Sequence, residues 1–484
     1  MSTTTLRSRR ASASRRSIDA AWLGFAVVLV AAVMDLLDST ITQTVAPAIR
    51  KDLGGSYADL EWISAGYTLA MSATLLLGSR LGDTLGRRRV LLFGMGGFVA
   101  ASAFCALAPS PLALIGGRAI QGAIAATMVP QGFGLIRELF GDQGQQKALA
   151  VFGPVMGLAA VGGPLVGGGL VNLDLLGVSW RAIFLVNLPL GVAAIVAGRR
   201  FLPRNAPSAP GARLDVPSVA LAMAGSVALV YPLIQGRQDG WPGWAFALLT
   251  GGVVMLGAFA ALQGRRARQR RAPLVEPSIL RRRPYVAGLA VVVGFIGAMG
   301  GMIIALNVMF QTGLGFSPLD SGIATVPIPV AAIAGSITSS ALLNRIGRTT
   351  MHLGIVTMAG GLIVVDLVLR SAGGGVSAWD LAGPLTITGF GMGMVFVPMF
   401  DVILAGVRPH ELGSASGLLQ SVQQLAISLG IAAVGTVLFD TVGSGRGPAA
   451  FVGATDHALL VAVGLLVAAC AAVFWLPKHA RAAH

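Results

Sequence analysis

Charged residues are scarce in this chain: Asp, Glu, Lys and Arg together make up 11% of its 484 residues. A soluble protein of this size would carry about 25% charged residues. The 55% hydrophobic share would make a water-exposed globule prone to aggregation, so the composition predicts that the solvent is lipid. Only two cysteines occur, Cys105 and Cys470. Both lie in apolar runs, which argues against a disulfide scaffold or a thiolate metal site.

Catalytic and metal-ligating sets of residues are also missing. No Ser/His/Asp arrangement occurs, and the histidines fall at expected helix ends or in the tail: His352, His410, His457, His479 and His484. The run Gly167–Gly169 follows no strand and precedes no Gly-Lys-Ser/Thr, which argues against a nucleotide loop. With no soluble domain to form a groove, the net charge of +15 indicates contact with anionic lipid rather than nucleic acid. The sequence predicts neither an enzyme nor a cofactor or metal site.

Long apolar runs, in contrast, are abundant. A membrane-spanning helix needs about 20 mostly apolar residues. Fourteen runs fit: 20–46, 60–79, 90–108, 112–136, 148–171, 182–198, 216–235, 244–263, 285–310, 321–343, 352–369, 381–404, 414–438 and 457–476. The first is too long for a signal-peptide core and contains two aspartates, so we expect an uncleaved helix. The sequence predicts an all-α polytopic membrane protein.

Basic residues alternate from one loop to the next. If both termini are cytoplasmic, most of the 35 basic residues lie in cytoplasmic segments, and the external segments hold only Arg50, Lys51, Arg181, Arg237, Arg370 and Arg446. Positive charge concentrates on the cytoplasmic side of membrane proteins. The even number of spans and this orientation therefore support each other.

Two hydrophilic stretches, 199–215 and 264–284, divide the spans into six, two and six. The segment 82–87 after the second span is faintly repeated at 343–348 after the tenth, as in transporters built from related six-helix halves. The predicted parts are a basic cytoplasmic tail (1–18), an N-terminal six-helix bundle (19–200), two additional helices with linkers (201–280), a C-terminal six-helix bundle (281–476) and a cytoplasmic tail (477–484).

Asp35, Asp38 and Arg118 are charged residues that lie inside predicted spans. Asp35 and Asp38 are three residues apart in the first span and share one helix face. Ionised acids at membrane depth are costly and usually face a wet cavity, where burial and a neighbouring carboxylate favour proton binding. Asp38 near the membrane surface would instead only cap the helix. Arg118 in the fourth span needs a partner from another helix, or else it extends to the outer interface. We predict proton coupling by these three residues.

Two further segments indicate moving parts. After the second span, Gly82 and Gly86 permit a tight turn. Asp83 can pair with a helix N-terminus or with an arginine. We therefore predict a conformational gate formed by Gly82, Asp83, Gly86, Arg87 and Arg88. The fifth span contains prolines and a glycine-rich segment, which predicts a bent, tightly packed helix. Polar residues within other spans are candidate lining of a substrate cavity, or else packing hydrogen bonds: Gln121, Asn307, Gln311, Gln420 and Gln424.

Together these motifs resemble the fourteen-helix drug:proton antiporter branch of the major facilitator superfamily, over nearly the whole chain. The likeness rests on Asp38–Ile41 with Pro47, on Trp62 with Tyr67, on Leu81–Arg88, on Arg118 with Gln121 and Gly122, on Gly163-Pro164 with Gly167-Gly168, on Trp180–Pro189, and on Gly413–Gly417 with Gln424. The chain departs from the pattern at Ser79, Gln43 and Ala46, and Asp35 is an addition. The thirteenth span lacks the acid that some relatives use for cationic drugs.

The resemblance implies a major facilitator fold and a proton-driven exporter of small amphipathic compounds by alternating access, with Gly163, Pro164, Gly167 and Gly168 as an antiporter motif. It implies no cofactor beyond the proton gradient, protons and membrane lipid as partners, a monomer, and the bacterial inner membrane. A uniporter or uptake symporter on the same fold, or a non-transporting membrane sensor, are the alternatives. The sequence names no substrate.

Overall fold

A computed structural model describes residues 3–174, 177–204, 215–269, 273–372, 375–404, 407–408, 411–443, 445 and 447–477. Every element in these ranges is a helix. The helices are α1 (Thr3–Leu53), α2 (Tyr57–Leu85), α3 (Arg87–Ala106), α4 (Pro111–Met128), α5 (Gln131–Leu173), η2 (Ser179–Arg181), α6 (Ala182–Leu185), α7 (Asn187–Phe201), α8 (Val216–Gln235), α9 (Gly243–Arg268), α10 (Pro277–Leu280), α11 (Arg283–Val308), η3 (Met309–Gly313), α12 (Pro318–Thr325), α13 (Pro327–Ile346), α14 (Thr349–Ala372), α15 (Ala378–Leu404), α16 (Leu412–Val442) and α17 (Pro448–Val473).

Fourteen segments within the described residues are long and apolar enough to cross a membrane, which confirms the predicted number. Several are assembled from shorter helices. The fourth span combines α4 with the start of α5, which is broken at Gly141 (φ 64°), and the fifth is the remainder of α5. Residues Ser179–Phe201, Arg283–Gly313 and Pro318–Leu343 are likewise continuous spans. The kink lies at a glycine because this backbone conformation is strained for other residues.

Helix starts follow from local sequence. Ser56 and Asp59 form a reciprocal capping box at the start of α2. Ser110 and Ser317 each cap a helix whose first residue is proline, α4 and α12 respectively. Proline suits this position because its missing N–H would have no partner there. The last span begins at Pro448, nine residues before the predicted start, because Asp456 is accommodated inside the helix by Arg370.

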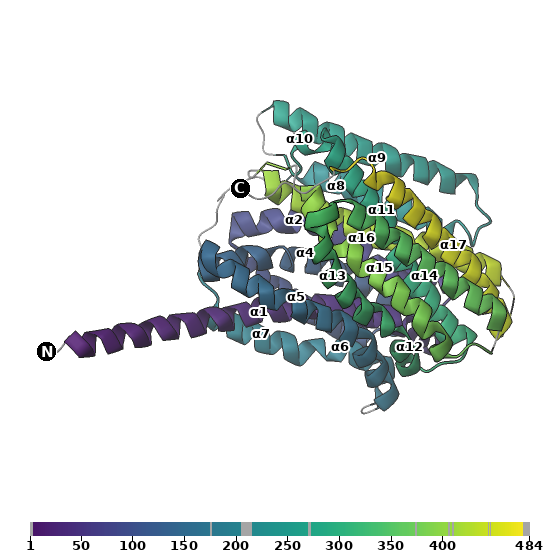
Figure 1. Cartoon of the computed structure of the whole chain (residues 1–484), viewed down its shortest axis with the longest axis horizontal. Coiled ribbons are helices and arrows are strands. Elements are labelled where there is room, and N and C mark those ends of the chain that lie inside the picture. Colours follow the sequence, from purple (N-terminus) through teal and green to yellow (C-terminus); the bar gives the residue numbers. More distant parts are fainter. Residues whose placement is uncertain are drawn as a thin grey trace.

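The helices run roughly side by side, with α8, α9 and α10 along one edge of the bundle and α6 and α7 along the opposite edge (Figure 1). In the first half, α2 packs on α4, and α1 packs on α5. In the second half, α15 packs on α13 and α14, and α11 packs on α16 and α17. Two seams join the halves: α2 lies against α16, and α5 lies against α12. The boundaries predicted for the two bundles stay predictions, and much of the 199–215 linker and of the 477–484 tail lies outside the described residues.

Both seams are closed at the end of the bundle where α1 finishes, which we call the Leu53 end. The ring of Tyr57 on α2 stacks on Phe439 of α16, with centroids 4.5 Å apart. Gln311 of η3 donates to the backbone carbonyl of Thr44 on α1 (2.5 Å). Backbone of α12 touches α5 near Gly168. The structure therefore represents a conformation in which the halves meet at the Leu53 end.

Candidate functional site

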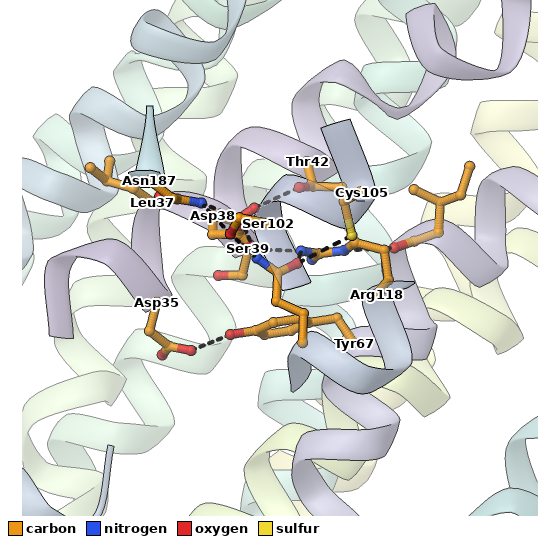
Figure 2. Close-up of polar contacts among 12 residues, drawn as sticks. Asp35, Leu37, Asp38, Ser39, Thr42, Tyr67, Ser102, Cys105, Arg118 and Asn187 are labelled. Atoms are coloured by element: carbon orange, nitrogen blue, oxygen red, sulfur yellow. Dashed lines mark hydrogen bonds and ion pairs between the residues drawn. The ribbon is translucent and has the colours of Figure 1, made fainter. Parts of the chain in front are cut away.

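A buried polar cluster lies in the first half, where α1, α3, α4 and α7 meet (Figure 2). Asp38 of α1 forms an ion pair with Arg118 of α4, and both side chains are 1% exposed. The other carboxylate oxygen, Oδ1, accepts hydrogen bonds from Gln121 Nε2 (2.9 Å) and from Asn187 Nδ2 (2.9 Å). Both amides also donate to the hydroxyl of Ser102 on α3, at 2.9 and 3.2 Å. Asp38 is thus neutralised and fully bonded, and it does not simply cap the helix end.

Asp35 lies one helical turn away in a different environment. Its carboxylate accepts a hydrogen bond from the hydroxyl of Tyr67 on α2, and its side chain is only partly buried. The guanidinium of Arg118 lies over the ring of Tyr67, 4.2 Å from the centroid, so one arginine contacts both acids, Asp38 directly and Asp35 through the tyrosine. Figure 2 shows Asp35 and Asp38 on the same side of α1, facing Tyr67 and Arg118. Asp35 thus has no direct cationic partner within the cluster, whereas Asp38 is paired with Arg118, and a proton-coupling role for either acid remains a prediction.

Arg118 is held in place from several sides. Its Nη1 donates to Gln121 Oε1 (2.7 Å), three residues along the same helix, and its Nε approaches the carbonyl of Ile63 at 3.5 Å. A Cβ added at Gly122 would lie 2.1 Å from the carbonyl oxygen of Tyr67, so the glycine lets α4 touch α2. This close approach brings the arginine onto the tyrosine ring. Its burial excludes the alternative that the side chain extends to the membrane surface.

Three residues of the cluster were not predicted from the sequence to lie there: Ser102, Asn187 and Tyr67. Ser102 and Asn187 are lone polar residues in apolar spans, and Tyr67 was connected only with a helix pattern. Ser102 is fully buried and Asn187 is 2% exposed. A single buried polar residue must find a hydrogen-bond partner in lipid, and Asn187 also lies within the Trp180–Pro189 motif, but neither signal predicts a contact with Asp38.

Asn187→Ala is expected to lower stability, because Asp38 Oδ1 would lose one of its two amide donors. We expect a loss of about 1–2 kcal/mol, since bonds to charged groups exceed the average of about 0.6 kcal/mol for hydrogen bonds between membrane helices. Thermal unfolding in detergent can be followed with a thiol-reactive dye, because Cys105 is fully buried. Asn307→Ala is the matched control: that amide bonds Ile303 and Ser321 and touches no charge, so it should cost less. Equal losses would contradict the expectation.

The predicted gate residues lie together at the end of α2 and the start of α3. Arg87 Nη2 is 3.6 Å from Asp83 Oδ1, and its Nη1 is 3.5 Å from Glu138 Oε1 on α5. Gly86 has φ 92°, which allows the turn into α3. A Cβ at Gly82 would lie 1.9 Å from Gln131 Oε1 of α5, and Arg88 donates to the carbonyl of Arg199. These contacts stay within the first half, and a gating role remains a prediction.

Helix α5 presents small residues on two sides. A Cβ at Gly163 would lie 2.2 Å from Thr40 Oγ1, and one at Gly167 would lie 2.6 Å from Ile41 Cγ2, both on α1. On the other side, a Cβ at Gly168 would lie 2.5 Å from Leu319 Cα, and one at Gly322 of α12 would lie 2.7 Å from the carbonyl oxygen of Pro164. The predicted motif therefore lies where α5 joins α1 to the second half.

Gly168→Ala is expected to disfavour the conformation closed at the Leu53 end, because the new methyl group meets backbone rather than a flexible side chain. Overpacking costs about 1–3 kcal/mol, so the ratio of closed to open molecules should fall by about fivefold to one hundredfold. Transport assays and thermal unfolding would report the change. Gly169→Ala is the control, since nothing lies within 4 Å of a Cβ there. If both variants behave like the wild type, the α5–α12 seam is not under this constraint.

The five candidate cavity residues are separated by the fold. Gln121 belongs to the Asp38 cluster. Gln311 bonds α1 across the halves, and Asn307 Oδ1 accepts from Ser321 Oγ of α12 (3.0 Å). Gln420 and Gln424 are half-buried on α16, one turn apart. Their contact with a substrate remains a prediction.

Comparisons with known proteins add to this geometry. A family model described as Major Facilitator Superfamily matches residues 28–431. The chain is 43% identical over 425 residues to the probable actinorhodin transporter of Streptomyces coelicolor, covering 87% of this chain and 73% of that protein. It is 34% identical over 455 residues to the puromycin resistance protein pur8 of Streptomyces alboniger, covering 92% and 88%. A crystal structure of an auto-inhibited POT family peptide transporter is similar in fold, with a TM-score of 0.66 and 19% identity, covering 95% of this chain and 99% of that one.

Proposed function

The chain belongs to the Major Facilitator Superfamily, and from this premise we propose that it is a proton-coupled antiporter that exports small amphipathic compounds by alternating access. Members of the family are transporters, so the chain is a transporter and not an enzyme. The observation that carries the proposal is the buried pair of Asp38 and Arg118 next to the partly buried Asp35. Ionisable groups inside a membrane protein are expensive and are typical of ion or proton pathways.

The substrate class follows from the relatives. Their names describe transport of, or resistance to, actinorhodin and puromycin, so we propose that the cargo is a drug, an antibiotic or a secondary metabolite. The proton gradient supplies the energy, and the mechanism needs no cofactor. We further propose that the chain works as a monomer in contact with membrane lipid.

We propose a bacterial inner-membrane location with both termini cytoplasmic. An even number of spans supports termini on the same side, and the distribution of arginine supports the cytoplasmic one. In this orientation the Leu53 end faces outwards, so the structure corresponds to the state closed to the outside.

We propose a coupling cycle centred on Arg118. In the observed state Arg118 neutralises Asp38, and Asp35 bonds only Tyr67 within the cluster. A proton bound at Asp35 removes a charge from the cluster, which stabilises the compact arrangement of α1, α2 and α4. Movement of α4 changes the distance from Arg118 to both acids and thereby their proton affinity. Binding of substrate and of proton then favour opposite orientations of the two halves.

The test uses purified protein in liposomes with a trapped pH-sensitive dye. A panel of amphipathic drugs is added, and the dye reports proton movement that depends on each drug. Proton movement driven by at least one drug supports antiport. Carriage of a drug without any proton movement would refute antiport and favour a uniporter on the same fold.

A further inference from the structure

The two additional helices, α8 and α9, are connected to both halves rather than standing apart. Helix α8 packs on α2 of the first half and on α16 of the second. Its residues Val219, Val230 and Ile234 share a hydrophobic core with α2, α11 and α16. Thr436 Oγ1 of α16 donates to the carbonyl of Leu233 (2.6 Å). The α8–α9 hairpin therefore lies along the α2–α16 seam.

At the Leu53 end of this seam lies a second buried ion pair, which the sequence analysis did not single out. Glu61 of α2 is fully buried, and Arg237, in the turn between α8 and α9, has a side chain that is 9% exposed. The pair is bidentate, with Nη1–Oε1 and Nη2–Oε2 distances of 3.5 Å each. An acid with no solvent contact needs such a partner, because an isolated buried charge is very costly.

Arg237 also contacts the second half. Its Nη1 donates to the carbonyl of Gly435 on α16 (3.0 Å), and its guanidinium lies 5.1 Å from the ring centroid of Phe439. A Cβ at Gly435 would lie 2.1 Å from Glu61 Oε1, so the glycine is what lets the acid reach the seam. One side chain of the hairpin thus touches both halves of the transporter at the same point.

Among the described residues, the other ion pairs at this end do not cross the seam. Asp52 of α1 pairs with Arg181 of η2 inside the first half (3.1 Å). Arg370 of α14 bonds Asp366 of its own helix and Asp456 of α17, all in the second half. When the halves rock apart at the Leu53 end, these pairs can move as units, whereas Arg237 cannot keep both Glu61 and Gly435.

We propose that Glu61 and Arg237 form a clasp through which the α8–α9 hairpin holds the Leu53 end closed. The clasp gives the two additional helices a role in the transport cycle, which a simple spacer would not have. Opening at this end requires Arg237 to give up either the carboxylate of Glu61 or the carbonyl of Gly435. The proposal rests on the alternating access of the proposed function, but on neither the substrate nor the proton.

The experiment measures the separation of the halves at the Leu53 end. Spin labels are attached at Leu107→Cys, after α3, and at Trp379→Cys, in α15; these residues are 79% and 85% exposed and belong to opposite halves. Cys105 and Cys470 are first changed to serine in the full-length protein. Distances between the labels are then measured by electron paramagnetic resonance in lipid nanodiscs, without drug or gradient. The wild type should show mainly the short distance.

Glu61→Gln and Arg237→Gln should each raise the ratio of long to short distances by at least about tenfold, because either change leaves a buried group without its partner. Asp52→Asn is the matched control and should leave the ratio unchanged. Thr436→Val removes the hydroxyl that bonds the carbonyl of Leu233 on α8 and the carbonyl of Ala432 on its own helix. It leaves no buried unpaired charge, so the variant should fold and shift the ratio in the same direction by less. Unchanged distances in Glu61→Gln and Thr436→Val, or an equal shift in Asp52→Asn, would overturn the clasp. If these variants shift the ratio in a protein that carries a drug without any proton movement, antiport is refuted and the clasp stands.

Discussion

Asp35→Asn is expected to abolish drug-driven proton movement in liposomes while drug binding is retained. The asparagine cannot bind a proton, but its side-chain oxygen can still accept the hydrogen bond from Tyr67, so the geometry around Arg118 should be preserved. Dye-reported proton flux should fall to the background of protein-free liposomes. Drug binding, measured by fluorescence quenching or equilibrium dialysis, should stay within about twofold of wild type because no contact of the cluster is lost.

Asp38→Asn is the informative comparison. That change leaves Arg118 buried without its carboxylate, so it should lower stability as well as transport. A stable Asp35→Asn protein without proton movement identifies Asp35 as the coupling acid in this chain. If Asp35→Asn still moves protons and a folded Asp38→Asn does not, Asp38 is the coupling acid, and Asp35 serves only to position Tyr67.

Arg118→Met is expected to have the largest effect on stability. The substitution keeps an unbranched side chain over Tyr67 but leaves Asp38 charged, buried and paired only with neutral amides. Breaking a buried ion pair by removing one partner costs about 3–5 kcal/mol. The apparent melting temperature in detergent should fall markedly, and drug-driven transport should be lost.

The double variant Arg118→Met with Asp38→Asn separates stability from function. Replacing both members of a buried ion pair with neutral residues is often close to neutral for stability, so the double variant should unfold near the wild-type temperature. Transport should remain absent, because no charged arginine is left to respond to the proton. If the single variant Arg118→Met is as stable as wild type, the proposed importance of the ion pair for the fold is wrong.

Much of this protein follows from local sequence. Each of the fourteen spans could be predicted because the need to bury an apolar helix in lipid acts on a short stretch of residues. Asp35, Asp38 and Arg118 could be singled out for the same reason, since charge is expensive at membrane depth. The prediction was poorest at the last span, which starts earlier than expected because Arg370, far away in the chain, makes Asp456 acceptable inside a helix.

Pairings between distant residues needed the tertiary structure. Nothing in the local sequence connects Asp38 with Asn187, or Glu61 with Arg237, because which helix faces overlap depends on how the helices pack. Gly435, which lets Glu61 reach α16, is one of 66 glycines, and nothing in the local sequence distinguishes it from the others. The sequence by itself determined the number of spans. It also identified charged residues that are too costly to lie inside a span without a role. Only the packing of helices decided which acid pairs with Arg118, which acid bonds Tyr67, and where Arg237 of the α8–α9 turn contacts both halves, because close approach of distant surfaces is a property of the whole fold.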